Sequence, residues 1–166
     1  MNDRTMKDKN GEHPFGDAGQ LILFFIFMAV WVADSFFLHR STFLARRIPL
    51  AVRLALLALA MCTTWFLFKS ASAVIHHGRR QDHVFESGAF RFVRHPLYLG
   101  VLLVYLGMTI ATASLFSLAV FAAIFLFYNY IAGYEEKLME GWFGEAYKSY
   151  RKKTGRWLPR LIRRRG

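Results

Sequence analysis

The sequence contains a single cysteine, Cys62, so an intrachain disulfide is impossible and no C-x-x-C pair exists to hold zinc or to carry out thiol chemistry. It also lacks the H-E-x-x-H pattern of zinc hydrolases and the G-x-G-x-x-G turn of dinucleotide-binding domains. Cys62 lies inside an apolar run, where we expect a small buried hydrophobic residue. No ligand pattern accompanies the histidines, and we therefore predict that the protein has no metal site.

Acidic residues are scarce as well, with 11 Asp and Glu against 22 Lys and Arg and a net charge of +11. Nucleic-acid binding is one explanation for such a charge. However, 55% of the residues are hydrophobic and the mean hydropathy is +0.25, which leaves little room for a soluble binding face. We therefore predict no nucleic-acid partner and a membrane protein whose basic surface lies beside anionic lipids.

Long apolar runs are abundant. They cover approximately residues 21–38, 49–74, 96–112 and 115–133. Each approaches the roughly 20 residues that a helix needs to cross the hydrocarbon layer, and only a helix satisfies its own backbone over so short a crossing. The third and fourth runs are separated by Ala113-Ser114 alone, which predicts a tight helical hairpin.

This pattern divides the chain into four parts: a polar tail (1–20), two N-terminal transmembrane helices (21–75), a functional core (76–160) and a basic tail (161–166). After Glu136, aromatic residues alternate with Lys and Arg. Such a segment either lies on the membrane surface or caps the hairpin. The predicted fold is an all-α integral membrane protein with about four transmembrane helices, a tight C-terminal helical hairpin and an amphipathic C-terminal segment.

The distribution of Lys and Arg predicts the orientation, because cytoplasmic loops carry an excess of them. Ten follow Gly133, which places the C-terminus in the cytoplasm, and the short chain without organelle signals suggests a prokaryotic cytoplasmic membrane. Arg40, Arg46 and Arg47 conflict with this scheme, because the first connection should lie outside. Either they snorkel to the far interface or the first segment is not a simple span. Asp34, near the same end, is expected to snorkel too.

Two polar clusters of opposite sign sit at the two ends of the predicted hairpin. The run from Ser87 to Gly100 opens it, and Glu135-Glu136 closes it. Pro96 suits a first helical turn, since its missing N–H would be unpaired there. A helix start carries free N–H groups and partial positive charge, so together with Arg94 it makes an anion site.

The chemistry of these two clusters leaves two interpretations open. They could cradle a zwitterionic ligand, with its anionic group at the helix start and its cation at the carboxylates. Alternatively, Arg94 and Glu135 could form an interfacial ion pair without any ligand. Polar groups beside membrane helices are costly to desolvate, which makes both clusters candidates for a functional site.

The same residues carry a resemblance to a known family. The string SGAFRFVRHPLYLG, followed after the hairpin by EEKLMEGWFGEAYKSYRKKTGRWLP, resembles the isoprenylcysteine carboxyl methyltransferase and phospholipid methyltransferase superfamily. The matching hallmarks are R-H-P-x-Y-x-G over Arg94–Gly100, the pair Glu135-Glu136, Phe143-Gly144 with Tyr147 and Tyr150, and the late Pro159. The match covers about residues 76–160, which is half of the chain.

The resemblance implies a membrane methyltransferase that uses S-adenosyl-L-methionine. The cofactor contacts it implies are His83, Val84, Phe85, Glu86, Phe90, His95, Pro96, Leu97, Tyr98 and Glu135, and Gly100 beside them could admit a ligand. Glu135 would balance the cofactor's cationic charge, and Arg94 with the helix start would hold its carboxylate. If the nucleophile is an amine, His95 or Glu136 would accept its proton.

Two positions depart from the pattern of the family. Phe90 stands where a Tyr is frequent, so a hydroxyl contact is missing. Ile131 stands where relatives acting on prenylcysteine place an Arg that holds the substrate carboxylate. The substrate is therefore expected to be a lipophilic small molecule or lipid that partitions into the membrane, with a carboxylate, a thiol or a lipid amine as the methyl acceptor.

Two other functions remain open at this point. Sterol reductases share a similar R-H-P-x-Y-x-G hairpin and use NADPH, although this chain is short for such a relative. A non-catalytic membrane scaffold of the same fold is the other alternative, consistent with the changes at Phe90 and Ile131. Four short helices could need a second copy to enclose a pocket, so a homodimer is also left open.

Overall fold

The computed structural model describes residues 16–77 and 84–160, and of His76 and His77 only the backbone. Within these stretches the chain is almost wholly helical and forms no β-strand, only a single parallel bridge between Val93 and Gly155. The helices are α2 (Gly16–Val32), its π-helical continuation η2 (Ala33–Leu38), η3 (Phe43–Arg46), α3 (Leu50–His77), η4 (Gly88–Arg91), α4 (Pro96–Thr112), α5 (Leu115–Phe143) and α6 (Glu145–Lys153). The all-α prediction is confirmed.

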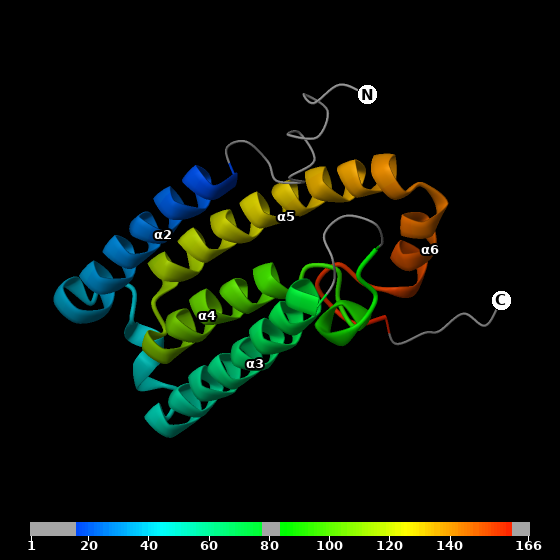
Figure 1. Ribbon diagram of the computed structural model, residues 1–166. Helices are drawn as coiled ribbons and strands as arrows, with labels where there is room; N and C mark the ends of the chain where they lie inside the picture. Colours follow the sequence, from blue (N-terminus) through cyan, green and yellow to red (C-terminus); the bar gives the residue numbers. More distant parts are fainter. Residues whose placement is uncertain (1–15, 78–83, 161–166) are drawn as a thin grey trace.

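The four long helices run up and down beside one another. In Figure 1, α2 lies beside α5, α5 beside α4, and α4 beside α3, in agreement with the packing between these pairs. Helix α2 begins beside the middle of α5, whereas the end of α5 and the short helix α6 lie at one end of the molecule. The site residues discussed below lie at this end, and the opposite end holds η2, η3 and the α4–α5 turn.

Three helical segments are long and apolar enough to cross a membrane: Gly16–Leu38, Leu50–Ile75 and Leu115–Phe143. Helix α4 is also apolar but has 17 residues, or about 25 Å at 1.5 Å per residue, less than the roughly 30 Å hydrocarbon core. The 29 residues of α5 span about 43 Å. Helix α5 therefore extends well past the start of α4, and the segments after it can fold back over that start.

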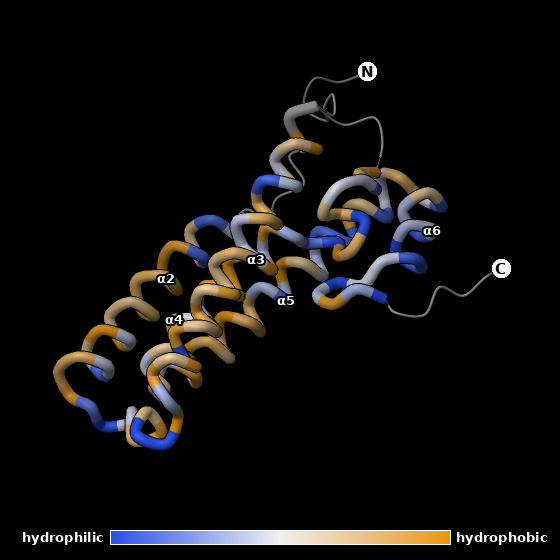
Figure 2. Tube along the Cα trace, turned by 90° about the horizontal axis from the view of Figure 1, so that it is seen from below, coloured by the Kyte–Doolittle hydropathy of each residue, from blue (hydrophilic) through white to orange (hydrophobic). Residues whose placement is uncertain are grey.

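The outer surfaces of these helices are apolar, as lipid contact requires. On α3, Leu59, Trp65 and Phe66 are each more than half exposed. Figure 2 shows hydrophobic residues along the helices and hydrophilic residues concentrated at the two ends of the molecule. Cys62 lies on this exposed surface of α3, so the expectation that it is buried within the protein was wrong.

Small residues bring α3 and α4 together. A Cβ atom added at Gly107 would lie 3.0 Å from the Cβ of Ala60, and one at Gly100 would lie 2.8 Å from Cε2 of Phe68. The Thr64 hydroxyl also donates to the Gly100 carbonyl at 3.0 Å. Small residues on a helix face permit this close approach in membranes. On the other side of α4, a core forms between α2, α4 and α5 from Phe27, Leu102, Tyr105, Ile124 and Tyr128.

The helix boundaries match the sequence prediction in part. Helix α4 covers the predicted 96–112, but α2 begins at Gly16, five residues before the predicted start at residue 21. Helix α5 does not end at Gly133 as predicted; it continues to Phe143, so the glutamate pair lies within the helix. Gly144 ends it, with a φ of 53° that a residue with a side chain rarely adopts.

A buried carboxylate holds together the end of the molecule opposite to α6. Asp34 is 2% exposed, so the expectation that it snorkels to the interface was wrong. It accepts hydrogen bonds from the Ser41 N–H at 3.0 Å, from the Ser41 hydroxyl, and from the Ser114 hydroxyl at 2.6 Å. Ser114 in turn caps α5 by accepting from the Ser117 N–H at 3.1 Å. The α2–α3 connection is thereby tied to the α4–α5 turn.

We expect Asp34→Ala to lower the free energy of unfolding by about 3 kcal/mol, because it leaves the buried donors of Ser41 and Ser114 without their charged acceptor. Thermal unfolding of detergent-purified protein measures this change. Ser35→Ala is the matched control, since the buried Ser35 hydroxyl has no hydrogen-bond partner among the described residues. An equal loss of stability in both variants would contradict the role assigned to Asp34.

Candidate active site

The candidate site begins at the start of α4. His95 is the residue that precedes the helix, with a φ of −122° and a ψ of 65°, and Pro96 occupies its first position. Pro96 is buried. No side chain of the described residues caps this first turn. The helix therefore presents N–H groups and partial positive charge to whatever lies beside His95.

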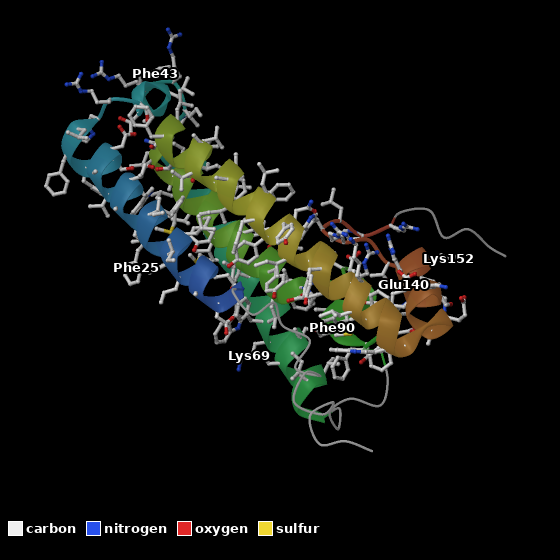
Figure 3. All side chains as sticks on the ribbon, turned by 90° about the horizontal axis from the view of Figure 1, so that it is seen from above. Phe25, Phe43, Lys69, Phe90, Glu140 and Lys152 are labelled. Atoms are coloured by element: carbon white, nitrogen blue, oxygen red, sulfur yellow. The ribbon has the colours of Figure 1, made fainter. Side chains whose placement is uncertain are left out.

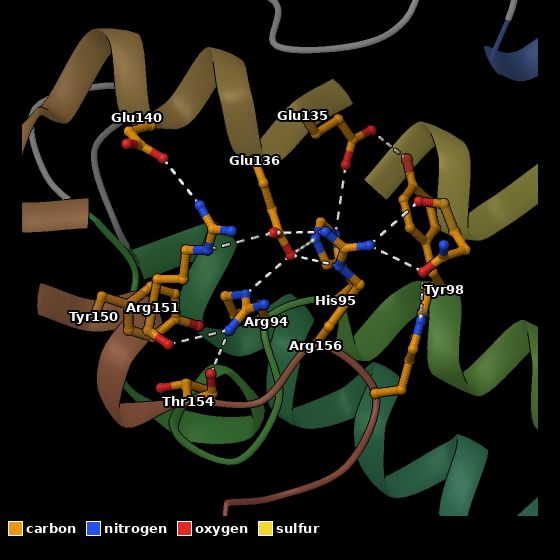
Figure 4. Close-up of polar contacts among 12 residues, drawn as sticks. Arg94, His95, Tyr98, Glu135, Glu136, Glu140, Tyr150, Arg151, Thr154 and Arg156 are labelled. Carbon is orange, nitrogen blue, oxygen red and sulfur yellow. Dashed lines mark hydrogen bonds and ion pairs between the residues drawn. The ribbon is translucent and has the colours of Figure 1, made fainter. Parts of the chain in front are cut away.

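Glu136 of α5 is the central acceptor of the site, with a side chain that is 3% exposed. The Arg94 Nε donates to its Oε1 at 2.9 Å. Arg156 binds it with two nitrogens: Nε donates to Oε1 and Nη2 to Oε2, both at 2.8 Å. Figure 4 shows this carboxylate between the two guanidinium groups. A third guanidinium, that of Arg151, lies 4.0 Å from Oε2. A buried carboxylate with several cationic partners and hydrogen bonds is well compensated for its desolvation.

Arg94 is committed to internal contacts. Its side chain is 7% exposed, and its Nη1 donates to the carbonyl oxygens of Thr154 and, at 3.3 Å, of Arg151. Its backbone N–H donates to the Gly155 carbonyl at 2.9 Å, next to the Val93–Gly155 bridge. The alternative of an ion pair between Arg94 and Glu135 is corrected, because Arg94 pairs with Glu136. Arg94 thus fastens the C-terminal segment to the connection before α4.

Helix α6 covers this arrangement rather than lying apart from it. Tyr147 and Tyr150 are buried beneath it, and the Tyr150 hydroxyl donates to the Phe90 carbonyl at 2.7 Å. Burial raises the pKa of Tyr147 to about 12, so this phenol stays protonated. The basic residues of α6 face outward. The structure thus shows that the amphipathic segment caps the hairpin, as one of the two expectations has it.

Glu135 has different partners from Glu136. Its Oε1 accepts from the Tyr98 hydroxyl at 2.5 Å, and its Oε2 lies 3.5 Å from Nδ1 of His95. The Tyr98 ring stacks on the His95 ring, with centroids 5.6 Å apart and planes 2° from parallel. Tyr128 of α5 packs edge-on against Tyr98 at 5.2 Å. The stacked side chains of His95 and Tyr98 therefore hold the Glu135 carboxylate at the start of α4.

His95 lies between the two glutamates. Its Nε2 is 3.3 Å from Glu136 Oε1, and its side chain is 11% exposed. Burial lowers the pKa of His95 below its ordinary value of 6.5, although the neighbouring Glu136 opposes this shift. The imidazole is therefore neutral at pH 7 and carries one N–H. If Nε2 donates to Glu136, Nδ1 beside Glu135 is left as a proton acceptor.

The remaining predicted cofactor residues are only partly brought together. Phe85 and Phe90 pack with ring centroids 5.8 Å apart, Val84 is half-buried and Glu86 is exposed. Leu97 and Gly100 face α3 rather than Glu135, and packing against α3 accounts for both. His83 lies outside the described residues. The role of every one of these residues in cofactor binding stays a prediction.

Sequence reasoning missed Arg156 and Asn129. Besides binding Glu136, Arg156 donates from Nη1 to the Asn129 Oδ1 at 2.9 Å, and the Trp157 Nε1 donates to the same oxygen at 3.2 Å. The guanidinium passes over Gly133, where an added Cβ would lie 3.8 Å from Nη2. Relatives that act on prenylcysteine carry an Arg at position 131, but here that position is the buried Ile131. The guanidinium near this part of α5 comes instead from Arg156 of the C-terminal segment. The available signal was charge balance, because two membrane-level glutamates need more than Arg94.

Among the residues that the structure describes, no three His, Cys, Asp or Glu side chains come close enough to hold a metal ion. The carboxylates of the site are instead paired with arginine, tyrosine and histidine.

The chain is similar to a known protein family and to individual known proteins. The model of a family described as phospholipid methyltransferase matches residues 48–146, more than half of the chain. The chain is 33% identical over 119 residues to the cobalt-zinc-cadmium resistance protein CzcN of Cupriavidus metallidurans, covering 71% of this chain and 53% of that protein. It is 29% identical over 93 residues to the protein-S-isoprenylcysteine O-methyltransferase of Schizosaccharomyces pombe, covering 55% of this chain and 39% of that protein.

The matches confirm the superfamily resemblance predicted from the sequence. The chain spans about half the length of the first of these relatives and less of the second. No solved structure matches the chain.

We expect Glu136→Gln to lower the free energy of unfolding by about 3 kcal/mol, because it leaves the buried Arg94 and the half-buried Arg156 without their counter-ion. Glu135→Gln keeps an acceptor for the Tyr98 hydroxyl and should cost about 1 kcal/mol. Thermal unfolding of both variants in the same detergent gives the comparison. Similar losses in the two variants would show that Glu136 is not the centre of the arrangement.

The lowered pKa of His95 predicts a pH dependence of stability. The unfolded chain binds this proton more readily than the folded protein, so stability is lost as the pH falls from 6.5 toward the lower pKa of the folded state. We expect the melting temperature to fall in that window, and to fall less in His95→Gln. His39→Gln, at an exposed histidine of the opposite end, is the control and should keep the wild-type profile. Identical profiles in wild type and His95→Gln would refute this assignment.

Proposed function

This chain belongs to the phospholipid methyltransferase family, and from that premise we propose that it transfers a methyl group from S-adenosylmethionine to a lipophilic substrate in the membrane. The observation that carries the proposal is the placement of Glu135, Tyr98 and His95 at an uncapped helix start. The three apolar helices long enough to span a membrane support an integral membrane location for the protein.

The residues present fit the proposed cofactor. S-adenosylmethionine combines a sulfonium and an ammonium with a carboxylate and a flat purine. Glu135 offers a carboxylate to the cations, and the first turn of α4 offers N–H groups to the carboxylate. The Phe85 and Phe90 rings offer an apolar surface on the preceding connection. These would be the residues that hold it, together with His95 and Tyr98.

The two glutamates have separate tasks in this proposal. Glu136 is a positioning residue, because it binds Arg94 and Arg156 and approaches one nitrogen of His95. This holds α5, the start of α4 and the C-terminal segment in one arrangement. Glu135 is the carboxylate placed to contact the cofactor, and the Tyr98 hydroxyl fixes its orientation.

Little further chemistry is required of the protein. When bound, S-adenosylmethionine supplies a methyl group that its sulfonium already activates for nucleophilic attack. The chain must orient a nucleophile toward that group and exclude water. If the nucleophile is an amine or a thiol, the neutral His95 can accept its proton at Nδ1, beside Glu135. A carboxylate nucleophile needs no such base.

The substrate class follows from the membrane location and stays broad. The site lies at one end of apolar helices, so we propose an acceptor that partitions into the bilayer and carries a carboxylate, thiol or amine near its surface. Ile131 supplies no charge for a substrate carboxylate. We also propose that the site faces the cytoplasm of a prokaryotic cell. The basic residues of the C-terminal segment, which share its end of the molecule, support that orientation.

Binding calorimetry of the detergent-purified protein tests the cofactor. We expect S-adenosylmethionine to bind, NADPH not to bind, and Glu135→Gln to weaken binding by at least about tenfold, which is the loss of one charge-assisted contact. Glu140→Gln is the matched control, because Glu140 pairs with Arg151 away from His95 and should bind as wild type does.

Each of the other outcomes has a defined meaning. Binding of NADPH alone would place the protein with the membrane reductases. If the protein unfolds cooperatively but binds neither S-adenosylmethionine nor NADPH, a non-catalytic scaffold is favoured. Equal binding by Glu135→Gln and wild type would remove Glu135 from the cofactor site.

A further inference from the structure

The segment after α6 returns to the depth of the membrane-spanning part of α5. The Trp157 ring lies 5.8 Å from the Phe125 ring, and its Nε1 donates to Asn129. Phe125 and Asn129 precede Glu136 by 11 and 7 residues, or about 16 and 10 Å along the helix axis. Both lie within Leu115–Phe143, which is long and apolar enough to cross a membrane. The Trp157 ring also lies 6.0 Å from the His95 ring, so the chain passes alongside the site and back toward the bilayer.

An exposed apolar residue follows directly. Leu158 is 77% exposed, more than any other large apolar side chain of the described residues. If Leu158 lies at the same depth in the membrane as the neighbouring Trp157, its exposed side chain contacts lipid rather than water. Its exposure is then favourable, because apolar side chains of interfacial segments insert at the boundary between headgroups and acyl chains.

Cations gather next to this leucine. The Arg160 Nη1 donates to the Lys152 carbonyl at 2.6 Å, which brings Arg160 to the end of α6 where Lys152 and Lys153 are exposed. Figure 3 shows Lys152 at the α6 end of the molecule, away from Phe43. None of these three cations forms an ion pair with a carboxylate in the part of the chain that the structure describes.

We infer that Leu158 with Lys152, Lys153 and Arg160 forms an interfacial anchor that binds the headgroups of anionic phospholipids. The charges meet lipid phosphates while the leucine enters the acyl region, the combination by which amphipathic segments bind anionic membranes. A nucleic acid would use the cations but not an apolar side chain at membrane depth. The anchor lies beside the candidate site but does not depend on methyl transfer.

Fluorescence quenching tests the anchor locally. Replacing Trp31, Trp65 and Trp142 by Phe leaves Trp157 as the only reporter. The protein is placed in lipid nanodiscs that contain equal mole fractions of brominated phosphatidylglycerol or brominated phosphatidylcholine. At low salt we expect brominated phosphatidylglycerol to quench Trp157 about threefold more strongly than brominated phosphatidylcholine does. The reason is that the three cations attract anionic lipids to the anchor. High salt should reduce the preference.

Two matched triple substitutions distinguish lipid binding by the anchor from the general attraction of a basic protein to anionic lipids. In K152Q/K153Q/R160Q the two lipids should quench equally, whereas R40Q/R46Q/R47Q, at the opposite end, should keep the preference. An unchanged preference in the first variant, or none in the wild type, overturns the inference. Tight RNA binding in discs of phosphatidylcholine alone, lost in the first variant, would assign the cations to nucleic acid instead.

A second measurement applies if the single-tryptophan protein does not fold. The same two triple variants are made in the wild-type background, and native mass spectrometry counts the phosphatidylglycerol molecules retained through detergent exchange. We expect fewer molecules on K152Q/K153Q/R160Q than on wild type. Equal retention contradicts the anchor.

Discussion

The carboxylate of Glu136 is the interaction on which the rest of the site depends. It is buried within α5 and joins Arg94 from the start of α4, Arg156 from the C-terminal segment and the ring of His95. Each of these groups would be costly to bury alone, and together they compensate one another. The cluster therefore specifies where the C-terminal segment docks, and that segment covers the helix start where His95 and Glu135 lie.

Helix length explains why this cover is needed. Helix α4 is too short to cross the hydrocarbon core by itself, while α5 continues about 18 Å further than α4 does. The start of α4 would otherwise present unsatisfied N–H groups near the membrane boundary. Gly144 reverses the chain, and α6 brings Thr154 and Arg156 back over that start. A polar site sheltered from water is the result, which suits transfer of an activated methyl group.

The sequence predicted the local features well and the long-range pairs poorly. The bounds of α4 followed from Pro96 and from the two-residue break after Thr112, and the family followed from ordered motifs. The end of α5 was misplaced because the glutamate pair was interpreted as an exit from the membrane. Arg156, which binds Glu136, lies 20 residues further along the chain, and helical periodicity gives no information over that separation. Burial of Asp34 escaped prediction for the same reason, since Ser114 contacts it from 80 residues away.

Photo-crosslinking shows whether the Glu136 cluster builds a methyl-donor site at the start of α4. Full-length protein in detergent is irradiated with radiolabelled S-adenosylmethionine, and the labelled peptide is mapped. We expect a label between Val84 and Tyr98 or beside Glu135, and unlabelled S-adenosylmethionine should compete with it. A competed label elsewhere, for example at the opposite end near Asp34, or no competed label at all, would contradict this assignment.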